Sequence, residues 1–217
     1  MSANPTGPEA GEPGPVLALL SRGLEFWVRQ QCQAIEQLEI RLEGSALQLL
    51  RGRLEGVSVR ARGVRYQELE MDDVRLRGEA MRVRMGRLLR HQSLELEDSF
   101  LVRGAIRFSA EGLNRSLAHP NWSWLGDQLA EDLLGIRPLA GLSLRDDQLI
   151  LQARSAAPES QVVERATRLT TQEGMVTLVS VEGEFCSSVP MDPAIRIERA
   201  ELAAGRLELG GEARIIP

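Results

Sequence analysis

Lysine is absent from this sequence, so all 26 basic residues are arginines. That absence excludes catalysis through a lysine Schiff base and the phosphate-binding lysine of a P-loop. Aromatic residues make up only 4% of the 217 residues, so leucine, valine, isoleucine and alanine must fill most of the core. The longest apolar run, residues 16–20, is far shorter than the roughly 20 residues that a membrane-spanning helix needs. Any membrane contact is therefore expected to be peripheral.

Histidine and cysteine, the usual metal ligands and nucleophiles, are also scarce. His91 and His119 have no neighbouring ligands at metal-site spacing, and we interpret both as loop residues. Cys32 and Cys186 form no CxxC pair, and a disulfide between them stays open. Because no histidine partner is evident, we interpret Cys186 as a buried structural thiol rather than a nucleophile.

No sequence motif of a known catalytic type is present. The hydrolase elbow GxSxG, the zinc motif HExxH, the dinucleotide motif GxGxxG and the P-loop are all missing. The paired carboxylates Asp72-Asp73 and Asp146-Asp147 fit turns better than acid–base catalysis, because adjacent strand residues face opposite sides. We therefore expect a protein that is not an enzyme and that holds no metal or cofactor.

Charge is distributed unevenly along the chain. The net charge is −5, yet residues 57–90 contain nine arginines against five acidic residues. A basic segment within an acidic chain suits a localised anionic partner better than nucleic acid. Scarce aromatic residues also oppose binding of single-stranded nucleic acid.

The first 15 residues differ in composition from the rest. They are rich in proline, glycine and acidic residues, which predicts a disordered tail. They lack the basic segment and apolar core of a signal peptide, so the expected location is cytoplasmic and peripheral on a membrane. No linker divides residues 16–217, which are interpreted as one domain.

Apolar residues at spacings of three and four predict a long helix over residues 16–38. Leu17, Leu20 and Leu24 lie on one side of it, and Trp27 continues this stripe. Leu19 and Phe26 lie almost opposite, so the first half of the helix needs apolar surroundings on both sides. A second, short helix is predicted for residues 46–54.

Beyond Gly56 the apolar period changes to two, which predicts strands with one polar face. Glycine recurs inside these strands and favours bulges and strong coiling. The recurrent glycines are Gly63, Gly78, Gly104 and Gly211. The predicted strands lie within residues 57–61, 74–77, 81–85, 94–97 and 100–108.

A pair of short helices is predicted in mid-chain. Ser109 would cap a helix over 110–118, and Asn121 would cap another over 122–134 that ends at Gly135. Hairpins follow, with turns at 146–147, 173–174 and 204–205; their strands are 142–144, 149–151, 166–170, 176–181, 195–197, 200–202, 207–209 and 213–215. The expected fold is α+β: a strongly curved antiparallel sheet wrapped around a long N-terminal helix, with a short helical pair in the middle.

Two groups of residues could carry a function. Arginines alternate along predicted strands and would share one face if the strands are neighbours, where their forked donors suit lipid phosphates. These are Arg60, Arg62, Arg75, Arg77, Arg82 and Arg84. The alternative is a solvated face balanced by Glu68, Glu70 and Glu79.

The apolar group lies on the N-terminal helix: Leu17, Leu19, Leu20, Leu24, Phe26 and Trp27. Together with Trp122 and Trp124 it suits either an apolar core or a bilayer interface. Neither alternative is excluded by the sequence.

Several segments resemble the LmeA-like phospholipid-binding proteins, a bacterial family. The resemblance covers residues 35–216 and rests on strand patterns and turns: residues 50–64, 69–76, 108–117, the hairpin around Asp146, and residues 189–197 and 204–209. It implies a fold akin to tubular lipid-binding proteins, with a helix, a coiled sheet and an apolar cavity. It also implies phospholipid binding, but no individual lipid contact.

The leading hypothesis is a non-catalytic protein that binds or transfers phospholipid, or binds an anionic membrane surface. The main rival is a protein-interaction or scaffold module that docks through the apolar helix, with a protein partner or a second copy of the chain.

Overall fold

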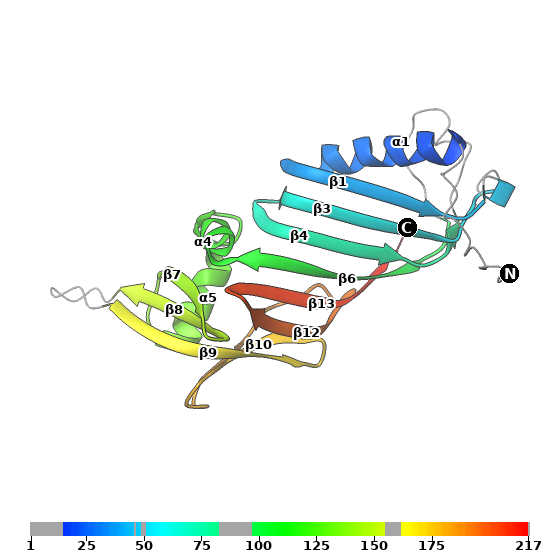
Figure 1. Cartoon of the computed structure of the whole chain (residues 1–217). Helices are drawn as coiled ribbons and strands as arrows, with labels where there is room; N and C mark the ends of the chain where they lie inside the picture. The colour runs from blue at the N-terminus through cyan, green and yellow to red at the C-terminus, as the bar shows by residue number, and fades with distance from the viewer. Residues whose placement is uncertain (1–14, 46, 49–50, 83–96, 155–161, 217) are drawn as a thin grey trace, which may run out of the picture.

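The structure, a computed structural model, describes residues 15–45, 47–48, 51–82, 97–154 and 162–216 (Figure 1). These residues form an α+β fold of helices and mainly antiparallel strands, as the sequence predicts. The helices are α1 (Pro15–Gln31), α4 (Ala110–Ala118) and α5 (Ser123–Leu134). The strands are β1 (Ala34–Glu43), β2 (Arg53–Leu54), β3 (Gly56–Tyr66), β4 (Leu69–Gly78), β5 (Met81–Arg82), β6 (Phe100–Ser109), β7 (Leu139–Arg145), β8 (Gln148–Arg154), β9 (Val162–Gln172), β10 (Met175–Ser180), β11 (Cys186–Ser188), β12 (Ile195–Ala203) and β13 (Arg206–Ile215).

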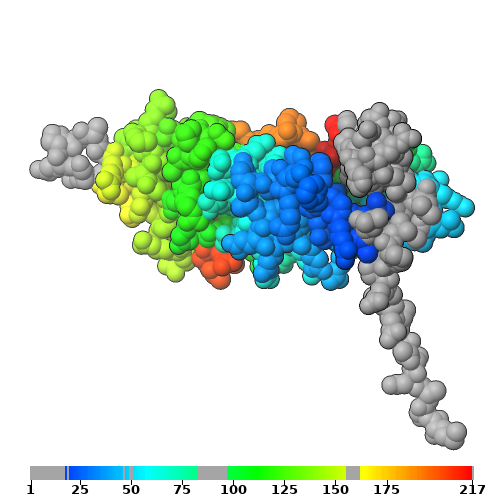
Figure 2. All heavy atoms as spheres, turned by 90° about the horizontal axis from the view of Figure 1, so that it is seen from above, coloured from blue at the N-terminus to red at the C-terminus, as the bar shows by residue number. Residues whose placement is uncertain are grey.

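Two large sheets carry the fold. One has six strands in the order β1-β3-β4-β6-β13-β12, and the other has five in the order β11-β10-β9-β8-β7. A short pair, β2 with β5, stands apart from both. The six-stranded sheet is curved but not closed, and α1 lies beside its edge strand β1 (Figure 1). The five-stranded sheet packs against the end of the six-stranded sheet that contains Val64 and Met71, and against β12. Seen from above, the described residues form an elongated body, with the blue N-terminal segment towards one end and the green and yellow middle of the chain towards the other (Figure 2).

The six-stranded sheet has two unlike faces. Apolar residues alternate along its central strands and form an inner face, to which Ala61, Val74 and Phe108 contribute. The intervening residues are mostly charged and form an outer face, for example Arg60 on β3 and Arg107 on β6. The confirmed period-two pattern therefore marks a sheet that is covered on one side.

The alternation breaks at one level of three neighbouring strands. Residues that pack into the same core are three positions apart there instead of two: Ile35 and Leu38 on β1, Ala61 and Val64 on β3, and Met71 and Val74 on β4. Gly63 lies at this level with φ of +57°, a left-handed conformation that glycine adopts at little cost. Gly63 therefore allows the backbone conformation at which the inward-facing positions shift by one residue.

The predicted helix over 16–38 is wrong in its last third. The helix ends at Gln31, and residues 34–43 form β1, which pairs with β3. The three-residue spacing of Ile35 and Leu38 resembles a helix, but it comes from the break in alternation beside Gly63. Local spacing could not reveal this, because the break is set by pairing with β3.

Predictions for residues 46–97 have mixed outcomes. Leu47 and Gln48 are helical, but Leu54 is buried in strand β2, so the predicted helix over 46–54 is wrong at its end. Strand β5 begins at Met81 as predicted. Positions 46, 49–50 and 83–96 lie outside the described residues, as do positions 1–14 of the predicted tail.

The mid-chain helices agree closely with prediction. Ser109 caps α4, accepting a hydrogen bond from the Gly112 amide at 3.3 Å. Helix α5 ends at Gly135 in a left-handed conformation, but Trp122 rather than Asn121 occupies its N-cap and makes no side-chain cap bond. The predicted turns at 146–147, 173–174 and 204–205 are all confirmed, each with positive φ at both residues.

The main core fills the space between α5 and the two sheets. Leu133 and Leu151 are fully buried there, and Leu129, Leu142, Leu149, Val176, Leu178 and Ile197 complete the cluster. Burial of each such side chain contributes roughly 1.5–3 kcal/mol. This core holds the five-stranded sheet and α5 to the β12 side of the six-stranded sheet.

A glycine pair in the centre of the sheet gives a test of the close approach between strands. Gly104 pairs with Gly211, and a Cβ at Gly104 would lie 2.1 Å from the Arg75 carbonyl oxygen. Gly104→Ala should therefore lower the free energy of unfolding by about 3 kcal/mol.

Gly23→Ala in helix α1 is the control, because no atom lies within 4 Å of the added Cβ. It should raise the free energy of unfolding by about 0.5–1 kcal/mol. Chemical denaturation measures both; equal stability of the Gly104 variant and the wild type would contradict the geometry.

Candidate functional site

Exposure of the inner face changes along the six-stranded sheet. At one end the five-stranded sheet and α4 cover it, and Val64, Met71, Val74, Phe108 and Leu207 are each less than 9% exposed. We call the opposite end the open end; it comprises Val57, Val59, Leu76, Val102, Ile195, Ala213 and Ile215. These residues are half-buried or exposed, although they continue the same apolar face.

The rim of the open end is the most exposed part of that face. Ile195 is 38% exposed and Ile215 is 37% exposed, and both point to the inner side at the ends of β12 and β13. Ile216, the next residue, is 72% exposed. An apolar sheet face that stays accessible is a typical binding surface for an apolar ligand.

Helix α1 lies beside the open end. Leu20 packs against the small cluster around Leu54 and Met81, which also includes Val57 and Phe100 of the inner face, so α1 covers part of this end. Leu24 is half-buried, whereas Phe26 is 64% exposed and Trp27 is 44% exposed. One stripe of the helix therefore faces the protein and aromatic residues remain outside. The side chains of Leu17 and Leu19 lie outside the described part of the chain.

Four of the six predicted arginines share the outer face of the six-stranded sheet. Arg60 lies directly opposite Arg75 in the β3–β4 register, with Arg62 and Arg77 on the flanking rows. Arg82 lies apart on β5, with its Nε 3.8 Å from the Asp98 carboxylate. Arg84 is outside the described residues.

Carboxylates neutralise most of this arginine group, but they are not all the predicted ones. Asp73 binds Arg75 at 2.7 Å, and Glu43 binds Arg77 at 2.8 Å. The predicted partners bind elsewhere: Glu68 lies near Arg65, Glu70 binds Arg115, and Glu79 binds Arg103.

The open end and the arginine group therefore lie on separate surfaces. The open end belongs to the inner face, and the arginine group belongs to the outer face of the same sheet. An acyl chain on the inner face and a headgroup on Arg60 would lie on opposite sides of the sheet. The sequence does not reveal this separation.

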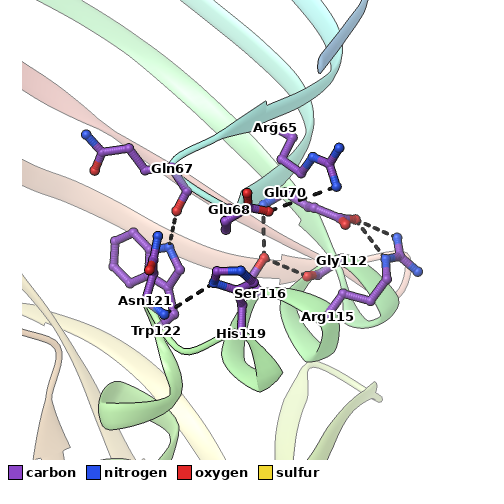
Figure 3. Close-up of polar contacts among 10 residues, drawn as sticks. All are labelled: Arg65, Gln67, Glu68, Glu70, Gly112, Arg115, Ser116, His119, Asn121 and Trp122. Carbon is purple, nitrogen blue, oxygen red and sulfur yellow. Dashed lines mark hydrogen bonds and ion pairs between the residues drawn. The ribbon is translucent and has the colours of Figure 1, made fainter. Parts of the chain in front are cut away.

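A polar junction closes the covered end of the inner face (Figure 3). The Trp122 indole donates to the Gln67 carbonyl oxygen at 2.8 Å, and the Glu70 amide donates to Ser116 Oγ at 2.9 Å. Arg115 donates to the Glu70 carboxylate through two nitrogens, at 2.9 and 2.6 Å. These contacts hold α4 and α5 on the β3–β4 hairpin.

The β3–β4 turn within this junction is strained. Gln67 and Glu68 both have positive φ, 49° and 66°, although neither is glycine or asparagine. Such a conformation persists only where surrounding contacts hold it, and the Trp122 indole supplies one of them. Trp122 thus has a structural role, while Trp124 is 48% exposed and donates to the Asn121 carbonyl oxygen at 3.0 Å.

The pKa of Glu70 is lowered mainly because its carboxylate accepts hydrogen bonds from Arg115. The pKa of Glu208 is lowered in the same way by Arg107. Both carboxylates lie in ion pairs within the sheet framework, so these shifts reflect structural pairing. Burial raises the pKa of Cys32, which makes its thiol a poor nucleophile.

Other residues considered for chemistry have structural surroundings. His119 Nδ1 accepts a hydrogen bond from the Asn121 amide at the end of α4. Asp146 and Asp147 form a turn, as predicted. Asp72 and Asp73 were expected in a turn but lie within β4, where Asp72 accepts a hydrogen bond from Ser109.

The two cysteines are both free thiols, so the open question of a disulfide is answered. Cys186 is exposed on β11, so its predicted burial is wrong. It ends up outside because the three-residue strand β11 directs only Ser187 inward. Over the described ranges, no three His, Cys, Asp or Glu side chains gather as a metal site would require.

Among the helices of the described residues, none has the length and apolarity needed to span a membrane. The fold and its surfaces define a class: an α+β protein whose open, curved antiparallel sheet presents an accessible apolar face. A family model described as LmeA-like phospholipid-binding matches residues 14–212. The chain belongs to this family, as the resemblance in its strands and turns indicates. Comparisons with curated proteins and with solved structures found no match.

The Glu70–Arg115 ion pair predicts a pH-dependent contribution to stability. Because the folded-state pKa of Glu70 is lowered, the contribution is fully present above the usual glutamate pKa of about 4.3. It disappears as the pH falls through the folded-state pKa. Glu70→Gln should lower the free energy of unfolding by about 1 kcal/mol at pH 7 and by clearly less near pH 3.

Urea denaturation at the two pH values measures this difference. Glu184→Gln is the control, because Glu184 is exposed beyond β10. This substitution should leave the free energy of unfolding unchanged at both pH values. An equal loss for Glu70→Gln at pH 7 and pH 3 would contradict an ionic role for the pair.

Proposed function

We propose that this protein binds phospholipid without catalysis, and that acyl chains lie on the open end of the inner face. The observation that carries the proposal is the change in exposure along one continuous apolar sheet face. Positions such as Val64 are buried by the rest of the fold, whereas Ile195 and Ile215 on the same face remain accessible. Membership of a phospholipid-binding family supports the choice of ligand.

The dimensions of the open end suit an acyl chain. From Gly211 to Ile215, β13 spans five residues, or about 17 Å at roughly 3.3 Å per residue. That is close to half of the ~30 Å hydrocarbon core of a bilayer, which is the depth of one leaflet. Each methylene buried there would contribute about 0.8 kcal/mol, so a covered chain would be held without any polar contact.

Helix α1 and the outer-face arginines would bring the protein to a membrane surface. Phe26 and Trp27 are exposed on α1, and apolar and aromatic residues on a surface helix suit a bilayer interface. Arg60, Arg62, Arg75 and Arg77 would favour anionic lipid. Association would be peripheral, and sheltering of acyl chains would allow the protein to transfer lipid between membranes.

Exposure of Phe26 also favours one alternative. A helix with an exposed phenylalanine can dock into a groove of another protein or of a second copy of this chain. In that case the open end would be covered by protein instead of lipid. The two hypotheses differ in whether lipid co-purifies with the chain.

Carboxylates placed at the rim of the open end test the acyl site. Ile195→Glu with Ile215→Glu should lower co-purified phospholipid about tenfold or more, because a charge beside acyl chains costs several kcal/mol. Both residues are more than a third exposed, so the fold should persist. Val162→Glu on β9 is the control, because Val162 is exposed at 52% but lies on the other sheet. Solvent extraction and lipid mass spectrometry measure the result, and equal lipid content in both variants would refute the site.

A substitution on α1 separates membrane docking from protein interaction. Phe26→Glu should leave the free energy of unfolding within about 0.5 kcal/mol, because Phe26 is mostly exposed. It should also weaken binding to phosphatidylglycerol vesicles in a sedimentation assay. Unchanged vesicle binding together with a lower molar mass in light scattering would instead assign α1 to a protein interface.

A further inference from the structure

Two arginines face each other in the middle of the outer face. Arg60 on β3 and Arg75 on β4 are direct partners in the antiparallel register. Side chains in such positions are neighbours, and like charges directly opposite destabilise a sheet. A negative charge beside the pair would therefore stabilise the sheet.

Carboxylates nearby compensate only part of it. Asp73 lies 2.7 Å from Arg75 and 3.7 Å from Arg62, so one carboxylate serves two guanidinium groups. Glu39 is opposite Arg60 on β1, but its carboxylate accepts a hydrogen bond from Arg41 at 2.6 Å. Within the described residues, Arg60 has no carboxylate within 4.0 Å.

Arg60 differs in this respect from the arginines around it. Each of the other arginines of β3, β4 and β6 has a carboxylate within 4.0 Å. They are Arg62, Arg65, Arg75, Arg77, Arg103 and Arg107. Across these three strands the outer face is thus a network of ion pairs, in which Arg60 keeps an uncompensated positive charge.

A shallow pocket of about 480 Å³ lies at this position. It is lined by Gln37 and Glu39 of β1, Arg60 and Arg62 of β3, and Asp73 and Arg75 of β4, with Leu38 and Ala61 at its base. Three guanidinium groups and the Gln37 amide offer donors to it, which is the chemistry that recognises phosphate oxygens.

We propose that this pocket binds a phosphate group, held between Arg60 and Arg75. The phosphate would supply the negative charge that Arg60 lacks, because its register partner Glu39 is engaged by Arg41. Its source is either the headgroup of a phospholipid in a membrane or a free phosphate compound. The first source rests on the proposed membrane docking; the phosphate chemistry itself does not.

Inorganic phosphate is the probe for the site. It should raise the thermal unfolding midpoint of the wild-type protein more than chloride does at equal ionic strength. Arg60→Gln should weaken the phosphate affinity derived from this shift about tenfold, since it removes a charged hydrogen-bond donor. Arg103→Gln is the matched control, because Arg103 lies on the same face but is already paired with Glu79 and Glu212; it should keep the response.

A second readout excludes a purely structural role for Arg60. Without phosphate, Arg60→Gln should unfold at the same temperature as the wild type or at a higher one, because the opposed like charges are gone. Three results would overturn the site. They are a lower unfolding midpoint for Arg60→Gln without phosphate, no shift of the wild-type midpoint by phosphate, and an equal loss of phosphate affinity in Arg60→Gln and Arg103→Gln.

Vesicles then distinguish the source of the phosphate. Phosphatidic acid vesicles, compared with phosphatidylcholine vesicles, present an exposed phosphate monoester. Loss of the phosphatidic acid preference in Arg60→Gln, but not in Arg103→Gln, would assign the pocket to a lipid headgroup. If the phosphate response depends on Arg60 but the vesicle preference does not, the pocket stands as a site for a free phosphate compound, and the proposed docking through this face fails.

Discussion

Antiparallel pairing of β1, β3, β4, β6, β13 and β12 assigns every side chain of these strands to one of two faces, and the rest of the molecule is arranged around that assignment. The inner face is apolar over its whole length, and the rest of the fold covers it only in part. The five-stranded sheet, α4 and α5 cover one end, where the polar junction around Glu70 and Ser116 holds them. They do not extend over the other end, and the accessible apolar surface follows from this difference in length.

Continuity of the inner face depends on a break in the same pattern. At the level of Gly63, three adjacent strands shift their inward positions by one residue, so the inner face continues around the curve. A flat sheet with unbroken alternation would turn Val64 and Met71 outward beyond this level. The left-handed conformation of one glycine thus keeps the apolar face continuous from the covered end to the open end.

The separation of apolar and basic surfaces has a functional consequence. At the proposed sites, acyl chains on the inner face and a phosphate at Arg60 would lie on opposite sides of one sheet. A protein of this kind could shelter one lipid while it contacts the headgroups of a membrane. The ion pairs elsewhere on the outer face limit the net positive charge, so docking would depend on a few unpaired positions rather than on the whole face.

Much of the fold could be predicted because its signals are local. Turn residues at 146–147, 173–174 and 204–205 defined the hairpins, Ser109 defined the start of α4, and Gly135 defined the end of α5. Strands with one polar face followed from alternation. Strand β1 was missed because the spacing of Ile35 and Leu38 resembles a helix, and only pairing with β3 explains it.

The candidate surfaces show the same division. The sequence by itself determined which side chains are available: an arginine-rich segment, an apolar α1 and alternating strands. It could not determine that Arg60 opposes Arg75, that Glu39 is engaged by Arg41, or that Ile195 and Ile215 lie at an open end. Those facts depend on strand order and register, which join residues far apart in the chain. Tertiary structure decided them, because the charge balance and the exposure of a side chain are set by its neighbours in space.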